Sequence, residues 1–219
     1  MNKDEIRCMF NKISNDYDFL NNLISLFLHK FIKGQAIKSL NIKADAKVLD
    51  ICTGSGDLAF IIKKNCTNCT IFAIDFSDEM LTIAKKKYPD IIFLKMDALK
   101  LDFDDESFDY IVMGFGFRNI IDKNLALTEI KRVLKKGGSL LHLDFGEKNF
   151  ASKISDFLIL IAARLFSKNF DAYKYLIKSK ETFYTPNELI DYISRYGFKC
   201  ILRKDFLFKV ISCQIFTKY

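Results

Sequence analysis

The chain has 219 residues, half of them hydrophobic, and a formal net charge of +7 from 34 basic and 27 acidic side chains. This length and apolar content suffice for one α/β domain with a sizeable core, which excludes a disordered chain and a cross-linked miniprotein. The lysines are scattered and often lie near acids, and no basic cluster has interleaved aromatic residues, so nucleic acid is a poor candidate partner.

No stretch of the sequence predicts a membrane span or a signal peptide. The longest apolar run of the later half, residues 157–163, ends at Arg164, well short of the ~20 residues that a spanning helix needs. Charged residues precede any apolar stretch at the N-terminus. We therefore expect a cytoplasmic protein whose six cysteines are reduced thiols. Cys66 and Cys69 form the only paired spacing, and without a second pair or nearby histidines we expect no metal site.

Residues 10–37 are expected to form a helical lid ahead of the core. Aromatic residues and leucines recur there with helical spacing, and so wide an apolar stripe needs a partner. The stripe consists of Phe19, Leu23, Leu26, Phe27 and Phe31.

Residues 47–64 predict a strand, a tight turn and a helix. Gly54 and Gly56 follow the apolar strand, and without a Cβ they let the backbone turn sharply and let a ligand lie against it. Free N–H groups and the positive helix end favour an anionic or carboxylate-bearing ligand at this turn. A Gly-x-Gly turn is also simply a way to turn, and that alternative stays open.

The next predicted strand, residues 70–74, ends in Asp75. This acid lies about twenty residues past the glycines, the spacing at which a carboxylate meets a ribose diol. Phe60 stands near the position of the third glycine of G-x-G-x-x-G, which favours a smaller nucleoside over a dinucleotide. Ser77, a good N-cap residue, then begins a helix that ends at residues 88–90.

The alternation of strands and helices continues and predicts a parallel, doubly wound sheet. Further strands are expected at residues 91–95, 108–113 and 139–144, with a helix at 122–134 that is closed by residues 135–138. Ligand groups of such a sheet lie outside the carboxyl ends of its strands. The polar or glycine-bearing positions that fall there are Asp50, Asp75, Asp97, residues 114–119 and Asp144.

The pattern changes after residue 146. Two very apolar helices are expected at residues 150–166 and 171–180, and Thr185 begins a capping box with proline at the first helical position. Two closing strands are expected at residues 198–203 and 206–216.

Several longer motifs carry a resemblance over nearly the whole chain. They are Tyr17-Asp18-Phe-Leu-Asn21 with Ser25 and His29, residues 50–57, residues 115–119, Arg132-Val-Leu-Lys135 with Gly137-Gly138, and Tyr173-x-Tyr175-Leu. In these motifs the chain resembles class I S-adenosylmethionine-dependent methyltransferases and, more narrowly, the UbiE/MenG family of ubiquinone/menaquinone-biosynthesis C-methyltransferases. It departs from the usual family residues at Ile32, Gly114, Lys136, Asp144 and Gly146.

The resemblance implies a Rossmann-like α/β fold, with a mostly parallel seven-stranded sheet, helices on both faces and an N-terminal helical lid. Residues 1–219 then form one domain, with the lid at 1–40, the cofactor-binding core at 46–146 and substrate-side helices and closing strands at 147–219.

The resemblance also implies S-adenosyl-L-methionine as the cofactor. Ser55 and the backbone of the glycine turn are expected to hold its methionine end, Asp75 the ribose hydroxyls, and Asp97 with Ala98 the adenine. Carboxylates suit both partners, because they accept hydrogen bonds from a diol and from an exocyclic amine; a loop cap is the alternative for Asp97. The whole expected set is Asp50, Thr53, Gly54, Ser55, Gly56, Asp75, Phe76, Asp97, Ala98 and Gly114, the last by its backbone alone.

The acceptor implied by the resemblance is a prenylated quinol, methylated at a ring carbon in menaquinone or ubiquinone biosynthesis. Such a transfer needs positioning and an electron-rich ring, so some group must lower the pKa of the neighbouring hydroxyl or take its proton. We expect Arg118 and Asn119 to orient and polarise the quinol oxygen, and Tyr17, Asp57 or His29 to remove the proton. The alternatives are a salt-bridging role for Arg118 and a packing role for His29.

Other readings stay open. His142, among leucines, is expected to be a core residue. The apolar stripe of residues 157–166, with Lys153, Arg164 and Lys168 nearby, is either core or a transient contact with the inner face of the cell membrane. A homodimer is compatible with the sequence. The alternative functions are methylation of another small molecule or tRNA, and a silent cofactor-fold subunit.

Overall fold

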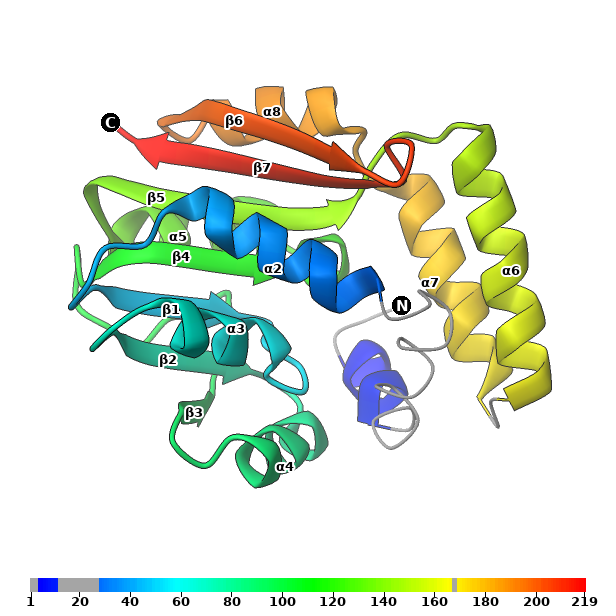
Figure 1. Ribbon diagram of the computed structural model, residues 1–219, viewed down its shortest axis with the longest axis horizontal. Coiled ribbons are helices and arrows are strands. Elements are labelled where there is room, and N and C mark those ends of the chain that lie inside the picture. The colour runs from blue at the N-terminus through cyan, green and yellow to red at the C-terminus, as the bar shows by residue number, and fades with distance from the viewer. Residues whose placement is uncertain (1–3, 12–27, 167–168) are drawn as a thin grey trace.

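The structure is a computed structural model, which describes residues 4–11, 28–166 and 169–219. Its described part contains a seven-stranded sheet with the order β3-β2-β1-β4-β5-β7-β6 (Figure 1). The strands up to β5 pair in parallel, and β7 pairs antiparallel with both β5 and β6. The strand bounds are β1 Lys47–Ile51, β2 Thr70–Asp75, β3 Ile92–Lys95, β4 Phe108–Gly114, β5 Leu134–Phe145, β6 Phe198–Phe206 and β7 Ile211–Lys218. The predicted fold class is therefore confirmed.

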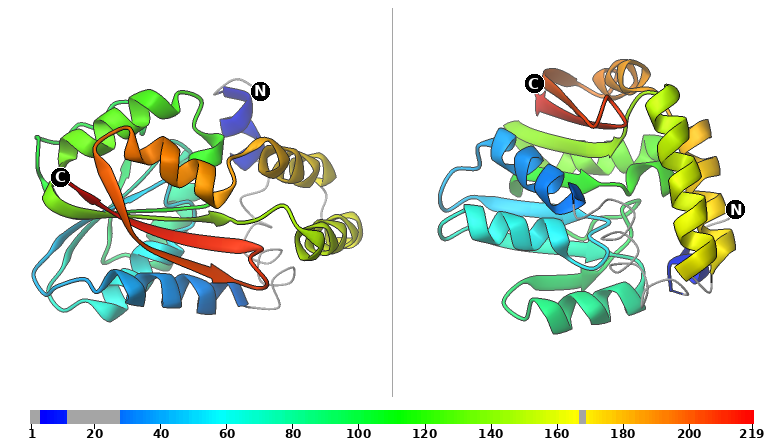
Figure 2. Two further views of the ribbon diagram at one scale, coloured as in Figure 1. Left: turned by 90° about the horizontal axis from the view of Figure 1, so that it is seen from above. Right: turned by 45° about the vertical axis from the view of Figure 1, so that its right-hand side comes forward.

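Helices cover both faces of the sheet, because alternate residues of its buried strands point to opposite sides. Val48 belongs to the apolar cluster shared with α2 (Leu28–Leu40), α3 (Asp57–Asn65) and α4 (Asp78–Lys87). Its neighbour Leu49 belongs to the cluster shared with α5 (Lys123–Val133) and α8 (Pro186–Ser194). Figure 2 (left) shows the sheet between these two layers.

The parallel strands point toward α6 (Phe150–Phe166) and α7 (Phe170–Thr182), which stand across the carboxyl edge of the sheet (Figure 1). The helical segment of residues 4–11 lies at the same edge, where Ile6 and Phe10 line cavities. Among the described helices, none combines the length and the apolar character that crossing a membrane requires. The carboxyl edge is thus enclosed by helices from both ends of the chain.

The helix α2 belongs to the core rather than to a lid. It packs on α3, and Ile32 is buried against the sheet. The prediction for Phe31 is wrong: this side chain is 61% exposed, because the helix turns Ile32 inward instead. The other residues of the expected stripe, Phe19, Leu23, Leu26 and Phe27, lie outside the described residues.

Two predicted boundaries need correction. Residues 135–138 do not form a closing segment after α5 but belong to β5, which begins at Leu134; this residue pairs with Phe108, and the register then shifts. The last strand begins at Ile211 rather than at Phe206, which ends β6. Residues 207–209 all have positive φ and make the turn between them. Such backbone irregularities follow from tertiary pairing and leave no periodic signal.

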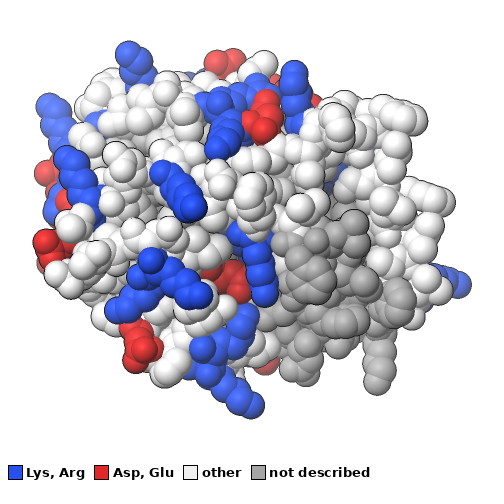
Figure 3. Space-filling view, in the orientation of Figure 1, with Lys and Arg blue, Asp and Glu red and all other residues white. Residues whose placement is uncertain are grey.

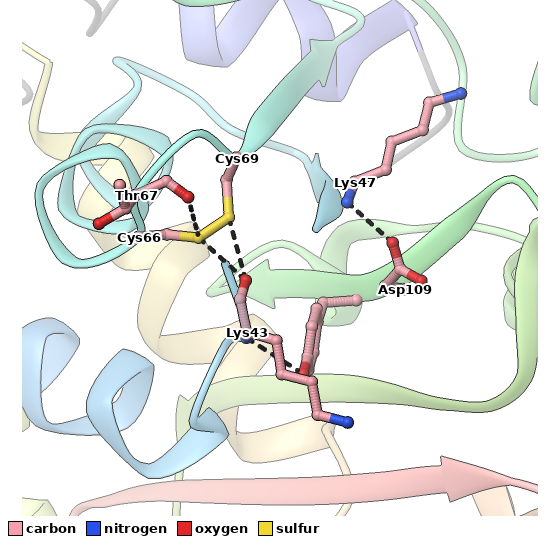
Figure 4. The surroundings of a disulfide bond; sticks show 7 residues. Lys43, Lys47, Cys66, Thr67, Cys69 and Asp109 are labelled. Atoms are coloured by element: carbon pink, nitrogen blue, oxygen red, sulfur yellow. Dashed lines mark hydrogen bonds between the residues drawn. A yellow bond between two sulfur atoms is a disulfide. The ribbon is translucent and has the colours of Figure 1, made fainter. Parts of the chain in front are cut away.

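The expectation that all cysteines are free thiols is also wrong. Cys66 and Cys69 form a disulfide between the end of α3 and the start of β2, with their Cα atoms 5.7 Å apart. Both sulfur atoms lie near the carbonyl oxygen of Lys43 (Figure 4). The short link between helix and strand holds the two residues within disulfide range. This bond lies at the amino edge of the sheet, away from the carboxyl edge where the cavities lie.

Candidate active site

The first glycine turn has the backbone that its sequence predicts. Gly54 and Gly56 have φ values of +56° and +86°, a left-handed region that residues with a Cβ avoid. A Cβ on Gly56 would lie 2.9 Å from the ring of Phe93, whereas a Cβ on Gly54 would meet nothing within 4 Å. The turn is therefore packed on one side and open on the other, where a ligand can approach the backbone.

Asp75 ties this turn to the next helix. Its Oδ2 accepts the N–H of Gly54 at 2.8 Å and its Oδ1 accepts the N–H of Ser77 at 3.0 Å. Burial raises the pKa of Asp75, and these backbone hydrogen bonds oppose the shift. Each carboxylate oxygen keeps a further lone pair, so the group can also accept hydrogen bonds from the hydroxyls of a ligand.

Asp50 acts from beneath the turn. Its fully buried carboxylate accepts the hydroxyl of Thr53 at 2.6 Å and the N–H of Ala59 at 3.1 Å. Burial raises the pKa of Asp50 to about 7. Asp50, Thr53 and Ser55 line neither of the two cavities described next. The structure thus gives Asp50 and Thr53 a bracing position in the turn.

Two adjoining cavities form a cleft over the carboxyl ends of the strands. Both are lined by Cys52, Asp75, Phe76, Gly116 and Asn119. One extends along the loop after β3, and its further lining includes Ile6, Met96, Asp97, Ala98 and Leu99. The other extends over the glycine turn, and its further lining is Phe10, Gly54, Met80, Gly114 and Phe115. An elongated ligand with a polar middle fits such a cleft, with its middle above Asp75.

Asp97 combines the two roles considered for it. Its Oδ1 accepts the N–H of Leu99 at 3.0 Å and so caps the loop, while the residue also lines the cleft beside Ala98. Gly114 lines the cleft by its backbone, because a Cβ there would lie 2.4 Å from a methyl group of Leu58. Leu58 therefore occupies the space that a side chain at position 114 needs.

Cys52 was missed as a lining residue, although it stands inside the predicted strand-turn motif. It has a φ of +58°, and burial raises the pKa of its thiol well above the usual range. A neutral, compact side chain thus forms part of the cleft floor between the two cavities.

Arg118 and Asn119, adjacent in the short helix η1 (Phe117–Asn119), have different surroundings. The Nη1 of Arg118 donates to Asp144 Oδ1 at 2.7 Å and to the carbonyl of Phe115 at 2.6 Å. Asn119 lines both cavities, and its Oδ1 accepts the hydroxyl of Tyr175 from α7 at 3.3 Å. The salt-bridging alternative is therefore present at Arg118, and Asn119 is the residue of this pair that borders both halves of the cleft.

Two of the three expected proton acceptors lie in a charged cluster between α2, α3 and α4. Asp57 lies 3.0 Å from Lys33 and 3.3 Å from Lys87, and Nε2 of His29 is 3.9 Å from its Oδ2. Burial raises the pKa of Asp57, but the two lysines outweigh it and hold the pKa well below its usual range. A carboxylate held so strongly in its ionised form is a weak base. Tyr17, the third candidate, lies outside the described residues.

His142 is a core residue, as expected. It is buried against the rings of Phe117 and Phe183, and its Nδ1 lies 2.8 Å from Gln214 Oε1. Burial lowers the pKa of this imidazole.

Comparisons with known proteins identify the family and support the fold. A demethylmenaquinone methyltransferase of Staphylococcus aureus (strain JH9) is 34% identical over 207 residues, which cover 90% of this chain and 86% of that protein. A SAM-dependent methyltransferase from Thermotoga maritima has a TM-score of 0.71 at 24% identity, with 96% of this chain and 99% of that chain covered. One from Aquifex aeolicus has a TM-score of 0.68 at 20% identity, with 92% and 98% covered.

The two structural likenesses, at such low identity, support the fold alone. The sequence comparison goes further, because the pattern of the ubiE/COQ5 methyltransferase family matches residues 1–218, nearly the whole chain. This protein belongs to the ubiE/COQ5 methyltransferase family.

Proposed function

We propose that this protein transfers a methyl group from S-adenosyl-L-methionine to a ring carbon of a prenylated quinol, in menaquinone or ubiquinone biosynthesis. Family membership and the demethylmenaquinone methyltransferase of Staphylococcus aureus support this reaction class. The observation that carries the proposal is the cleft itself, in which Asp75, the open side of Gly54 and Asn119 border one elongated space.

The residues around this cleft fit the proposed cofactor. The carboxylate of Asp75, at the centre, suits the ribose hydroxyls, and the loop with Asp97 and Ala98 suits the adenine. The open side of Gly54, near the positive N-terminus of α3, suits the carboxylate of the methionine end. When bound, the cofactor supplies an electrophilic methyl group on a sulfonium sulfur.

The acceptor is expected beside Asn119. An amide can hold a quinol hydroxyl in either direction, as donor or acceptor, and so can orient the ring for an in-line transfer. The charge of Arg118 is already balanced by Asp144, so we assign it mainly the positioning of the loop that carries Asn119. Its share in polarising the quinol oxygen is correspondingly smaller than the sequence suggests.

Removal of the proton from the quinol hydroxyl is assigned to His29. The low pKa of Asp57 disfavours this carboxylate as the base, but its charge can stabilise a protonated imidazole on His29. Tyr17 remains the alternative base. Substitution separates the two: loss of turnover in His29→Gln, with S-adenosylhomocysteine binding kept, favours His29, and the same result in Tyr17→Phe favours Tyr17.

Methyl transfer from labelled S-adenosyl-L-methionine tests the reaction directly. Tail-less and prenylated forms of demethylated naphthoquinol and benzoquinol are offered in parallel, so that the preferred ring is measured. Labelled product from at least one quinol supports the proposal. If the cofactor binds but label appears only in added tRNA or another small molecule, the protein is a methyltransferase for that acceptor instead. If the cofactor does not bind, the protein is a silent cofactor-fold subunit.

A prenylated substrate resides in a bilayer, so we place the working enzyme in the cytoplasm and at the inner face of the cell membrane. Association of two copies is a separate prediction.

A further inference from the structure

The helix α6 presents its apolar side to solvent instead of to the protein. Its inner side carries Ile159 and Ala163 against Tyr173 of α7, together with Asp156, which pairs with Lys180 of α7 at 2.6 Å. On the outer side, large apolar residues recur at spacings of three and four residues, the pattern of one helix face. Its exposed large apolar residues are Phe150, Ile154, Phe157, Leu158, Ile161 and Leu165. We call this set the outer face of α6.

The exposed charged side chains of α6 are all positive. The other exposed residues between positions 150 and 165 are Lys153 and Arg164, and no acidic residue is exposed there. Lys153 and Arg164 are separated by eleven residues, about three turns, so they lie along the same edge of the helix. In Figure 3 the surface over α6, on the right, carries almost no charged side chains. An apolar stripe with a cationic edge complements an anionic, apolar surface.

The turn between β6 and β7 extends this surface. Phe208 at its tip is 88% exposed, and the flanking Leu207 and Lys209 are exposed as well. The turn is held beside the start of α6, because Asn149 donates to the carbonyl of Phe208 at 2.8 Å and Gly146 donates to Val210. A Cβ on Gly146 would lie 2.2 Å from the carbonyl oxygen of Lys209. Glycine at position 146 therefore permits this close approach.

The same helices reach the cleft. Tyr175 of α7 contacts Asn119 in the wall of both cavities, and the Lys180–Asp156 pair joins α7 to α6. Figure 2 (right) shows α6 and α7 side by side across the carboxyl edge of the sheet. A surface that binds the outer face of α6 is thus joined, through α7, to the wall of the cleft that contains Asn119.

We propose that the outer face of α6, together with Phe208, docks on the surface of a bilayer that contains anionic lipids. The inference rests on the proposed function, since the lipid substrate gives the docking its purpose. The helix lies in the plane of the interface, with its apolar residues among the acyl chains and Lys153 and Arg164 among the anionic headgroups. A second copy of the chain fits less well, because two such faces would bring their cationic edges into one apolar contact.

Flotation with lipid vesicles tests this docking. The whole chain is mixed with vesicles of phosphatidylcholine, with or without phosphatidylglycerol, and the bound fraction is measured. We expect binding that increases with phosphatidylglycerol and falls with salt. Phe157→Asp and Leu165→Asp, made separately, should each weaken the partition at least roughly tenfold, because each replaces an exposed apolar side chain that would enter the bilayer by a charge. Ile201→Asp, at an exposed apolar residue of β6, is the matched control and should bind as the wild type.

Activity separates this inference from the proposed function. Phe157→Asp should methylate a tail-less demethylated quinol at the wild-type rate and lose activity on the prenylated quinol in vesicles. If the wild type methylates the tail-less quinol but does not float, or if both aspartate variants float as well as the wild type, the docking is wrong and the function stands. Sedimentation that shows a dimer dissociated by Phe157→Asp would assign the face to a second copy instead. If no quinol is methylated by the wild type, the function itself fails.

Discussion

The guanidinium of Arg118 lies 2.7 Å from the carboxylate of Asp144, and only 5% and 0% of the two side chains are exposed. This pair ties the loop after β4 to the end of β5. We predict that Arg118→Ala lowers the free energy of unfolding by about 3–5 kcal/mol, because it leaves Asp144 as an unpaired buried charge. Urea unfolding measures this change. Arg118→Met with Asp144→Asn should regain most of the loss.

Lys95→Ala is the control for this prediction. It removes a contact with Asp78 in which both side chains are more than half exposed, so it should cost no more than about 1 kcal/mol. Equal losses for Arg118→Ala and Lys95→Ala would show that the buried pair does not stabilise the loop.

The two glycines of the first turn should respond differently to alanine. Both substitutions place a Cβ in the left-handed region, at a cost of about 1–2 kcal/mol. Gly56→Ala adds a close contact with Phe93, so it should lower the melting temperature further than Gly54→Ala. Gly54→Ala should stay folded and bind S-adenosylhomocysteine more weakly, since its methyl group enters the cleft. A larger loss of stability for Gly54→Ala is the result that contradicts this description of the turn.

Asp75→Asn should weaken the binding of S-adenosylhomocysteine. An amide loses the negative charge and offers one acceptor oxygen where Gly54, Ser77 and the ligand hydroxyls all donate. The loss of hydrogen bonds to a charged group, 1.5–3 kcal/mol, corresponds to a roughly 10- to 100-fold rise in Kd. Calorimetric titration measures it, with Asp78→Asn as the exposed control. Unchanged affinity in Asp75→Asn would remove Asp75 from the cofactor site.

The raised pKa of Asp50 should make the stability of the fold depend on pH. The pKa of its carboxyl rises from an ordinary value of 3.8 to about 7 on folding, so the folded protein keeps the proton in that range. The stability that this group contributes is complete below about pH 4 and is lost as pH rises through 7, by roughly 4 kcal/mol at most.

Asp50→Asn removes this titration. The wild type should therefore lose stability relative to Asp50→Asn between pH 4 and pH 8, as measured by urea unfolding at several pH values. Asp78→Asn, at an exposed carboxylate, should run parallel to the wild type. A constant difference between the wild type and Asp50→Asn across this range would mean that Asp50 is ionised in the folded protein.

Local patterns predicted the sheet and the glycine turn well, because both depend on nearby residues. Alternating strands and helices fix a parallel sheet, and Gly54 and Gly56 adopt the conformation for which glycine is needed. The position of Asp75 followed from the end of a strand. Such features need no knowledge of distant partners.

The surroundings of the predicted site residues depend on distant contacts. Lys33 and Lys87 stand on either side of Asp57 in the fold but are 24 and 30 residues away in sequence. The partner of Arg118 comes from the next strand, 26 residues on. The sequence identifies Asp57 and Arg118 as candidate site residues. Whether each can react with a ligand depends on contacts between elements that are distant in sequence.

The crystal structure of this protein with S-adenosylhomocysteine tests the central claim most directly. We predict that the nucleoside lies in the cleft, with its ribose hydroxyls within hydrogen-bond distance of Asp75 and its adenine beside Asp97 and Ala98. A nucleoside bound elsewhere, or one whose hydroxyls do not approach Asp75, would contradict the account.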